Sequence, residues 1–361
     1  METNTIKNIQ NNLDILLEKD DIVELRIIGA QRGVMSGYFN TSKALADAAA
    51  PWSGGVPGIY VTLNKCNPEI LVRSENMLRT RPPEATSDAD ILSRRLLLVD
   101  LDPKRPPGIS STDAEHELAI AKAWEIKEYL NKEGFPDPII ADSGNGAHLL
   151  YRIQMDNDDT SRDLIKGFLE VLDLRFSDIG VTVDTGVYKA SQITKAYGTV
   201  ACKGSNSKER PHRLSGFISV PESIELVSTD RIVELTRLHP EKTLVKKISG
   251  GKNVDIDAWL RKVGLSVIKK EPKYGGQLYV LKVCPFNPEE HNTACAYIIQ
   301  FPDGGIMVRC FHTSCKDNGW LELRDRYEPG WRDSDGDEDS PVKQAEQIIA
   351  FCESAELFTD I

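Results

Sequence analysis

"LLLVDLDPKRPPG", residues 96–108, places an apolar run directly before two aspartates and a proline-rich turn. The run predicts a buried strand, and side chains along a strand point alternately to its two faces. Asp100 and Asp102 therefore project from one face at the C-terminal end of the strand. A turn at Asp102-Pro103 accounts for only one of them. Two carboxylates at the edge of a core need a compensating cation, which is either a divalent metal ion or one of the nearby bases Arg94, Arg95, Lys104 and Arg105.

The residues after this strand alternate between helical and strand patterns. Thr112 and Glu115 have the spacing of a capping box, and Ser-Gly-Asn-Gly at 143–146 is a typical hairpin turn. After the strand that ends at Asp102, the expected elements are a helix over 115–134, strands over 138–142 and 147–153, a helix over 164–176 and a strand over 181–184. This β-α-β-β-α-β order is that of ferredoxin-like and RNA-recognition-type folds. The sequence therefore predicts an α+β protein with such a core.

The expected topology brings further polar residues toward the two aspartates. Its third strand runs antiparallel beside the first, so His148 is expected next to Asp100 and Asp102. His148 is either a structural hydrogen-bonding group or a phosphate contact, helped by N–H groups of the glycine-rich turn. Asp184 would complete an oxygen site suited to magnesium or manganese. A last strand antiparallel to the first would, however, end at the opposite end of the sheet, so the pattern alone does not bring Asp184 to the pair.

Charge is unevenly distributed along the 361 residues. The formal net charge is −11, which argues against a nucleic-acid partner for the chain as a whole, but residues 332–361 carry much of the acidic excess. Residues 189–213 are basic instead. This basic stretch is either a solvated face or a phosphate-binding wall; its bases are Lys189, Lys195, Lys203, Lys208, Arg210 and Arg213.

Two classes of protein are disfavoured by the hydropathy pattern. The sequence has no apolar run of 18 residues, and its first 21 residues lack a basic segment followed by an apolar one. Neither a membrane span nor a signal peptide is predicted. We therefore expect a soluble, cytoplasmic protein, and at about 100–200 residues per domain we expect two domains.

Four of the seven cysteines fall within 32 residues, and this clustering favours a metal site over disulfides in a cytosolic chain. Two short ligand pairs brought together by a hairpin turned at 302–305 match a closed tetrahedral zinc site; the expected ligands are Cys284, His291, Cys310 and Cys315. Two further residues compete with them. Cys295 lies among small apolar residues and is better explained as a buried hydrophobe, whereas His312 remains an alternative ligand.

These motifs, in this order and spacing, resemble the archaeo-eukaryotic primase superfamily, in particular the primase-polymerases of phages and mobile elements. The residues that carry the resemblance are VDLDP at 99–103, SGNGAHLLYRI at 143–153, VTVD at 181–184, ITKAYGTVACKG at 193–204 and RPHR at 210–213. The zinc cluster is similar to the module that follows the catalytic core in eukaryotic and herpesviral primase-polymerases. The resemblance spans about residues 20–330.

The resemblance implies a DNA primase-polymerase, a nucleotidyltransferase that makes and extends primers on single-stranded DNA from nucleoside triphosphates. Asp100, Asp102 and Asp184 would hold two Mg²⁺ or Mn²⁺ ions, and one structural Zn²⁺ would bind in the cysteine cluster. His148 would contact the incoming triphosphate together with the turn residues, and basic side chains would neutralise its phosphates. The nucleotide-binding residues implied are Ser143, Gly144, Asn145, Gly146, His148, Lys195, Lys203 and Arg210. This chain departs from many members in having Gly146 in place of a serine, and Gln192 or Lys195 where an arginine stands.

The expected domain organisation follows from the sequence pattern and the same resemblance. It comprises a catalytic domain at 1–225 with an N-terminal α/β unit (1–92) and the RNA-recognition-like core (93–225), a connector at 226–255, a zinc-binding module at 256–331, and an acidic linker with the start of a helix at 332–361. Primases of this type often continue into a helicase, so we expect a piece of a primase-helicase encoded by a phage or mobile element in a bacterial cytoplasm.

Two other functions fit parts of the pattern. A non-catalytic, zinc-dependent protein that binds single-stranded nucleic acid during replication would use the cysteine cluster and the sheet. A nucleotide-sugar transferase would also use an Asp-x-Asp pair with manganese. The transferase would need neither Asp184 nor the basic stretch nor the zinc module.

Overall fold

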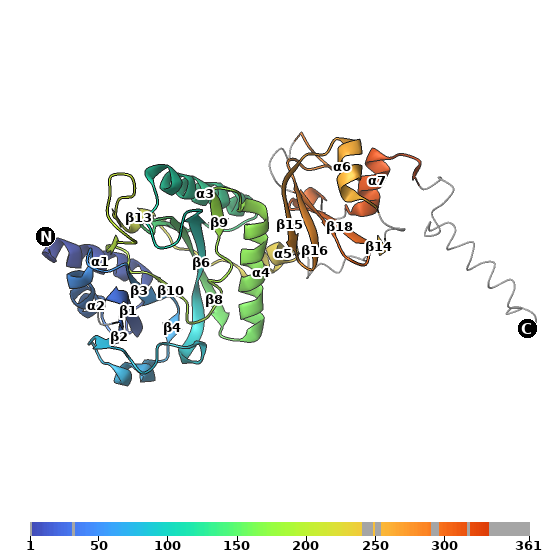
Figure 1. The fold of residues 1–361 in the computed structure, drawn as a ribbon. Coiled ribbons are helices and arrows are strands. Elements are labelled where there is room, and N and C mark those ends of the chain that lie inside the picture. The colour runs from blue at the N-terminus through green and yellow to red at the C-terminus, as the bar shows by residue number, and fades with distance from the viewer. Residues whose placement is uncertain are drawn as a thin grey trace, which may run out of the picture. The chain divides into compact units, whose positions relative to one another are not determined.

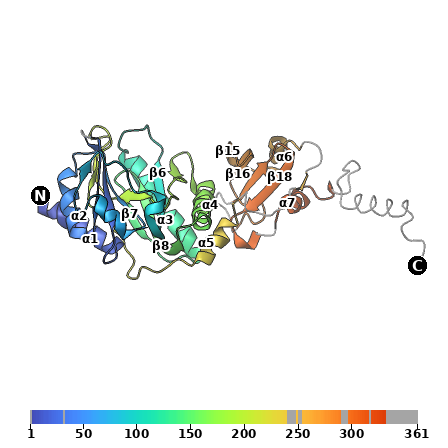
Figure 2. The same ribbon diagram turned by 90° about the horizontal axis from the view of Figure 1, so that it is seen from below.

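The computed structural model describes residues 2–30, 33–239, 248–249, 254–289, 296–315 and 318–331 (Figure 1). The chain divides into two compact units after His239. Helix α5 (Thr229–Thr236) belongs to the first unit because it packs on α4 (Asp159–Phe176) and buries Ile232 and Leu235 (Figure 2). Part of the connector expected at 226–255 is therefore a packed amphipathic helix. No helix in the described ranges combines the length and the apolar content needed to cross a membrane.

The N-terminal part of the first unit is a five-stranded antiparallel sheet covered by two helices. Its strand order is β10-β3-β1-β2-β5, and the elements are α1 (Glu2–Leu16), β1 (Val23–Ala30), β2 (Gly33–Phe39), α2 (Ser42–Ala49), β3 (Gly58–Thr62), β5 (Arg79–Thr80) and β10 (Ile193–Lys195). Apolar side chains of α1, α2 and the sheet form one core, with Leu25, Ile27 and Ile59 fully buried. Helices α1 and α2 and strands β1, β2, β3 and β5 all fall within the α/β unit expected at 1–92. Strand β10 joins this sheet from far along the chain.

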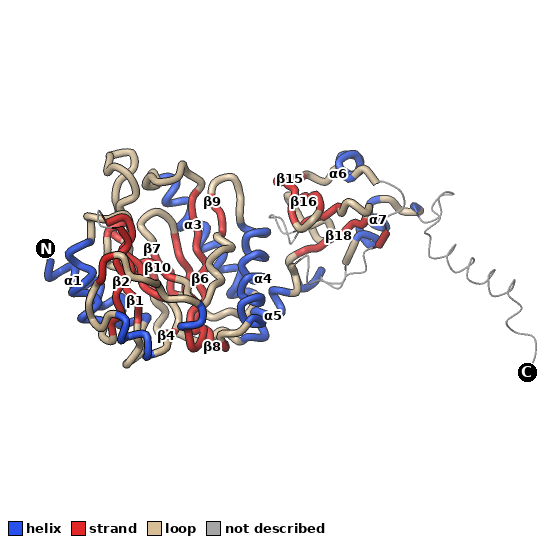
Figure 3. Tube along the Cα trace, turned by 60° about the horizontal axis from the view of Figure 1, so that its bottom comes forward, coloured by secondary structure: helices blue, strands red, loops and turns tan. Residues whose placement is uncertain are grey.

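A second antiparallel sheet holds the stretch that opens the sequence analysis. Its strand order is β13-β7-β8-β6-β4, and β9 also pairs with β6. The strands are β4 (Lys65–Cys66), β6 (Ile91–Pro103), β7 (Ile139–Asp142), β8 (Ala147–Asp156), β9 (Val181–Val183) and β13 (Gly216–Ser219), and helix α3 (Asp113–Lys132) follows β6 in the chain. A separate short pair is formed by β11 (Val200–Ala201) and β12 (Arg213–Leu214). The predicted order strand, helix, two strands, helix, strand is observed as β6-α3-β7-β8-α4-β9 (Figure 3).

Local sequence explains why β6 lies in the middle of this sheet. Leu96, Leu97, Leu98 and Val99 are all buried, so both faces of the strand are covered, which is expected for a continuous apolar run. The predicted capping box opens α3: the Thr112 hydroxyl accepts from the Glu115 N–H at 3.2 Å, and the Glu115 carboxylate accepts from the Thr112 N–H at 2.8 Å.

The second unit is a smaller α/β module with its own core. Its sheet has the order β14-β18-β17-β16-β15, and its elements are β14 (Ile248–Ser249), α6 (Ile256–Val263), β15 (Val267–Lys273), β16 (Gly276–Leu281), β17 (Ala296–Gln300), β18 (Gly305–Cys310) and α7 (Trp320–Tyr327). Trp259 of α6 and Trp320 of α7 meet edge to face, with ring centroids 4.8 Å apart. The hairpin expected at 302–305 joins β17 to β18, where the Gly304 N–H donates to the Phe301 carbonyl.

Candidate functional site

Three aspartates meet at the C-terminal end of β6. Asp100 pairs in register with His148 on β8, as the topology predicts. Strand β9 pairs only with the last three residues of β6, so it starts opposite Pro103 at the end of that strand and runs back as far as Leu101. The Asp184 N–H then donates to the Asp100 carbonyl at 2.8 Å. A last strand that runs the full length of the sheet, as expected from the sequence, would place Asp184 at the opposite end. That expectation is wrong, because β9 is short and pairs only with the end of β6.

The side chains of these residues line one cavity of about 180 Å³. Its walls include the carboxylates Asp100, Asp102 and Asp184, the basic residues Lys195 and Lys203, and His148. Carboxylates and cations therefore share a single small space. The arrangement is suited to a ligand that carries both a metal ion and negative charge.

Electrostatics inside the cavity favour a bound cation. Burial raises the pKa of Asp100, but the attraction and hydrogen bond of His148, whose Nε2 lies 3.3 Å from Asp100 Oδ1, together with the charges of Lys203 and Arg105, outweigh this and leave the pKa below its usual value. Asp184 behaves in the opposite way. Burial raises its pKa, and repulsion from Asp100 and Asp102 adds to the rise, although the Gly186 N–H opposes it. Asp184 has no cationic side chain within 4 Å in the described part of the chain.

The nearby arginines do not neutralise all three carboxylates. Arg105 Nη1 lies 3.3 Å from Asp102 Oδ1. Arg94 donates to the Tyr188 carbonyl, and Arg95 forms a buried ion pair with Asp21. Of the bases considered in the sequence analysis, only Arg105 is paired with either aspartate of the Asp100–Asp102 pair among the described contacts. Ion pairing with a nearby arginine therefore compensates the charge of Asp102 but leaves the charge of Asp184 uncompensated.

The turn at 143–146 is held by contacts of its own. The Asp142 carboxylate accepts from the Gly144 N–H at 2.6 Å and contacts His116 Nε2 at 2.9 Å. The Gly146 N–H donates to the Ser143 hydroxyl at 3.0 Å. These two backbone donors, which were expected to help bind phosphate, are thus already used within the turn. Ser143 and Asn145 line the cavity, whereas Gly144 and Gly146 do not.

Gly146 is explained by a close approach of two strands. A Cβ atom at this position would lie 2.1 Å from the Leu101 carbonyl oxygen on β6. No side chain fits there without moving β6, which carries Asp100 and Asp102. The glycine at this position therefore has a steric cause in this chain.

The basic stretch 189–213 splits into two groups. Lys195 and Lys203 line the cavity. Arg210 instead forms an ion pair with Glu115 at 2.8 Å, and Arg213 forms one with Asp113 at 2.6 Å, so both bind the N-terminus of α3. Arg210 is not among the residues that line the cavity, and its phosphate contact stays a prediction.

Lys195 is unusual because it is only 4% exposed. It lies opposite Tyr60 in the pairing of β10 with β3, and its ammonium sits 5.6 Å from the centroid of that ring. Burial lowers the pKa of Lys195 to about 8, and Lys203 contributes to the decrease. A buried lysine that faces a polar cavity is a strong candidate for contact with an anionic ligand.

Sequence reasoning missed the wall of the cavity that the N-terminal sheet provides. Tyr60 on β3 and Gln192 and Thr194 beside or on β10 line it. Tyr197, just after β10, places its hydroxyl 2.6 Å from His148 Nδ1. No local pattern predicts these residues. They reach the site only because β10, which comes after the strands β6 to β9 of the second sheet in the sequence, pairs with β3 of the N-terminal sheet.

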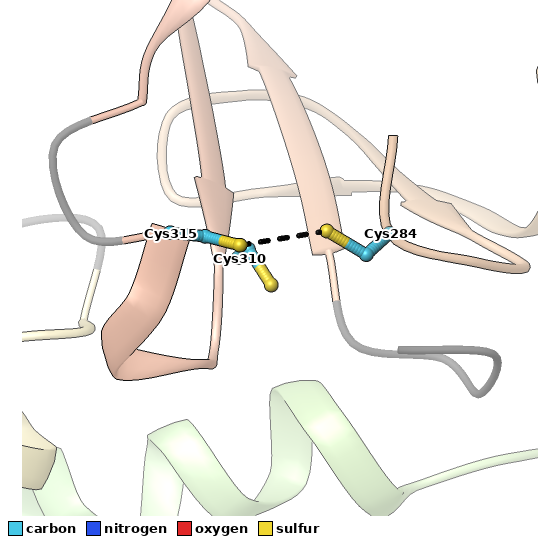
Figure 4. Close-up of side chains that lie close together, drawn as sticks. All are labelled: Cys284, Cys310 and Cys315. Atoms are coloured by element: carbon cyan, nitrogen blue, oxygen red, sulfur yellow. Dashed lines mark hydrogen bonds between the residues drawn. The ribbon is translucent and has the colours of Figure 1, made fainter. Parts of the chain in front are cut away.

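The second unit contains a compact group of three thiols, from Cys284, Cys310 and Cys315 (Figure 4). All three are buried and their sulfur atoms lie within 4.8 Å of one another. The Cys284 and Cys315 sulfurs are 3.8 Å apart, which is far longer than the ~2.05 Å of a disulfide. It matches the edge of about 3.8 Å expected for a tetrahedron with Zn–S distances of about 2.3 Å. The donor set therefore fits a zinc ion.

The fourth ligand of this group is not fixed by the described residues. His291 and Cys295 both lie outside them. His312 Nδ1 lies 3.2 Å from Cys310 Sγ, but the ligand atoms that approach one another within 4.8 Å in the described part of the chain are those of the three cysteines.

Comparisons with known proteins add little to this geometry. No family model matches the chain, and no curated protein matches it. Among solved structures, one described as "Crystal structure of primase RepB'" aligns with a TM-score of 0.35 and 12% sequence identity. The alignment covers 66% of this chain and 64% of that one, so it spans less than two thirds of the length of the matched structure.

Proposed function

We propose that the first unit is a template-directed nucleotidyltransferase, a DNA primase-polymerase of the archaeo-eukaryotic primase type. The observation that carries this proposal is the convergence of Asp100, Asp102 and Asp184 with His148 and Lys195 in one cavity. These residues come from four separate segments of the chain. The order β9-β6-β8-β7 with α3 and α4 in the connections supports the proposal, because it is the split βαβ arrangement of RNA-recognition-like cores.

The three carboxylates would hold two divalent cations, Mg²⁺ or Mn²⁺. When bound, such a pair lowers the pKa of an attacking 3′ hydroxyl and stabilises a leaving pyrophosphate. The donor set fits, because oxygen ligands suit these hard cations and because burial, with the charges of the two other carboxylates, raises the pKa of Asp184.

Other residues of the cavity would bind and orient the triphosphate. Lys195 and Lys203 supply positive charge, and His148 supplies a ring N–H near Asp100. The Asn145 side-chain oxygen already accepts from the Ser111 N–H at 2.9 Å, so its NH₂ group is the one that remains for a ligand. Holding the phosphates in line with the attacking oxygen is most of what the protein must do in such a reaction.

The size of the cavity also fits one end of a nucleotide. Pockets that enclose whole drug-sized ligands have volumes of roughly 300–1,000 Å³, and this cavity has about 180 Å³. It is large enough for metal ions with phosphates and too small to enclose a base as well. The base would therefore lie outside it, where a template strand can pair with it.

A synthesis assay tests the proposal directly. The full chain is incubated with single-stranded DNA, labelled ribo- or deoxynucleotides, and Mg²⁺ or Mn²⁺. We expect labelled oligomers that depend on both template and metal. Template binding without synthesis would favour the non-catalytic nucleic-acid-binding function, and transfer of a sugar from a nucleotide-sugar without template would favour the transferase.

Lys195→Met is expected to weaken nucleotide binding and, at the same time, to stabilise the first unit. The lysine pKa of about 8, against a usual value of 10.5, corresponds to about 3 kcal/mol of unfavourable charge burial. The unfolded chain binds the extra proton between these two values, so this cost is largest below pH 8 and disappears as the pH rises toward 10.5. We therefore expect a higher Tm at pH 7, with a gain that shrinks at alkaline pH.

The same variant should bind nucleoside triphosphate about 10- to 100-fold more weakly, because it loses one charge-assisted contact. Calorimetry or a fluorescent nucleotide measures this change independently of synthesis. The exposed Lys208 provides the matched control, and Lys208→Met should alter neither quantity. A Lys195→Met protein with unchanged nucleotide affinity would remove Lys195 from the site.

Template affinity is expected to fall steeply with salt despite the net charge of −11. Basic side chains that contact DNA phosphates release counterions, so log K decreases linearly with log salt. Fluorescence anisotropy with a labelled single strand, measured across a salt series, tests this expectation. A flat response would show that the basic stretch does not bind the template backbone.

A further inference from the structure

His148 is held between two polar groups, one on each side of its ring. Nδ1 lies 2.6 Å from the hydroxyl of Tyr197, and Nε2 lies 3.3 Å from Asp100 Oδ1. Both rings are buried, His148 with 5% and Tyr197 with 1% of its surface exposed. The Tyr197 hydroxyl also lies 3.3 Å from the hydroxyl of Thr194. Every polar atom of the histidine ring therefore has one defined neighbour.

These neighbours determine which ring nitrogen carries the proton. A neutral imidazole has one N–H donor and one acceptor nitrogen. The Asp100 carboxylate can only accept, and so can a phosphate group, so Nε2 must be the donor toward the cavity. In the neutral ring Nδ1 must then accept, and Tyr197 has to donate. Burial raises the pKa of Tyr197, so this hydroxyl keeps its proton, and the Thr194 hydroxyl can in turn donate to the phenol oxygen.

We infer that Tyr197 is a positioning residue that fixes His148 in the tautomer with the proton on Nε2, so that an N–H points into the cavity. The catalytic consequence rests on the function proposed above. With the other tautomer, Nε2 would present a lone pair to a carboxylate or to a phosphate, and the interaction would be repulsive. The hydrogen bond made by one ring nitrogen commonly sets the state of the other in this way.

Tyr197→Phe tests the inference because it keeps the ring and removes only the hydroxyl. We expect the rate of nucleotide incorporation at saturating template to fall about 10- to 100-fold through a higher KM for nucleotide, a lower kcat, or both. Tyr151→Phe is the matched control. Tyr151 is equally buried on the neighbouring part of β8, and its hydroxyl has no hydrogen-bond partner among the described residues, so this variant should retain wild-type kinetics.

A second readout does not depend on activity. In protein labelled with ¹⁵N in its histidine rings, two-bond proton–nitrogen correlations show which nitrogen is protonated, and a His148→Gln sample assigns the signal. We expect wild-type His148 with the proton on Nε2, and in Tyr197→Phe a loss of that preference. Tyr151→Phe should give the wild-type pattern.

The outcomes separate this inference from the proposed function. A wild-type protein with the proton on Nδ1 overturns the inference even if Tyr197→Phe does not fold. So does a Tyr197→Phe protein that keeps its tautomer, or one that changes tautomer without losing activity. A wild type that makes no oligomers on any template overturns the proposed function instead, and the nitrogen spectrum still decides what Tyr197 does to His148.

Discussion

Asp184→Asn is expected to abolish primer synthesis while leaving the first unit as stable as the wild type, or more stable. The substitution keeps the size of the side chain, and the amide oxygen can still accept from the Gly186 N–H, which donates to Asp184 Oδ1 at 2.7 Å. It removes one of three negative charges needed to hold two cations. Loss of several kcal/mol of transition-state stabilisation corresponds to a decrease of at least about 10³-fold.

The expected gain in stability follows from the direction of the Asp184 pKa. Burial and the charges of Asp100 and Asp102 raise it above the usual 3.8. The folded protein therefore holds this proton more tightly than the unfolded chain, so stability decreases as pH rises through the interval between the two values and stays reduced at pH 7. A neutral asparagine removes that cost. Thermal unfolding at pH 7 measures it.

Asp156→Asn serves as the control for this experiment. Asp156 is exposed at the far end of β8, the strand that carries His148, so its charge is distant from the cavity along the same strand. We expect wild-type synthesis from this variant. If Asp184→Asn also retained full synthesis with Mg²⁺ and Mn²⁺, the two-metal site would be refuted.

The part of the site that could be predicted lies on regular, locally specified structure. The apolar run before Asp100 specifies the central strand, and the turn at 143–146 starts β8, whose second residue His148 lies opposite Asp100. Both follow from the two-residue period of strands and from hairpin chemistry. The β-α-β-β-α-β order could be predicted for the same reason.

The rest depends on how far each strand extends and where it pairs, which local patterns do not encode. Asp184 reaches Asp100 because β9 has only three residues. Tyr60 reaches the cavity, and Tyr197 reaches His148, because β10 pairs with β3. The resemblance implies a phosphate contact for Arg210, and in the structure Arg210 pairs with Glu115, a residue of the capping box of α3. Such long-range ion pairs compete with ligand binding for the same charges.

Cys310→Ser is expected to have the largest effect on the second unit, where it should remove the bound zinc and lower the thermal stability of the module. Cys310 ends β18, and its sulfur lies in the buried group with Cys284 and Cys315. Burial and the neighbouring Cys284 raise the pKa of Cys315, so packing alone does not favour thiolates here and a metal ion must displace the protons. Structural zinc contributes about 10–16 kcal/mol to the folding of small zinc-finger peptides.

Metal analysis and thermal unfolding together test the zinc prediction, with Cys66→Ser as the control. Cys66 is a buried thiol of the first unit that contacts the Thr62 hydroxyl, so this variant makes the same chemical change away from the cluster and should keep about one zinc per chain. Because the metal would replace a large core in this module, chelation of the wild type should lower the unfolding temperature of the second unit as Cys310→Ser does. A Cys310→Ser protein that retains one zinc per chain would show that another residue completes the site and that Cys310 is only a packed thiol.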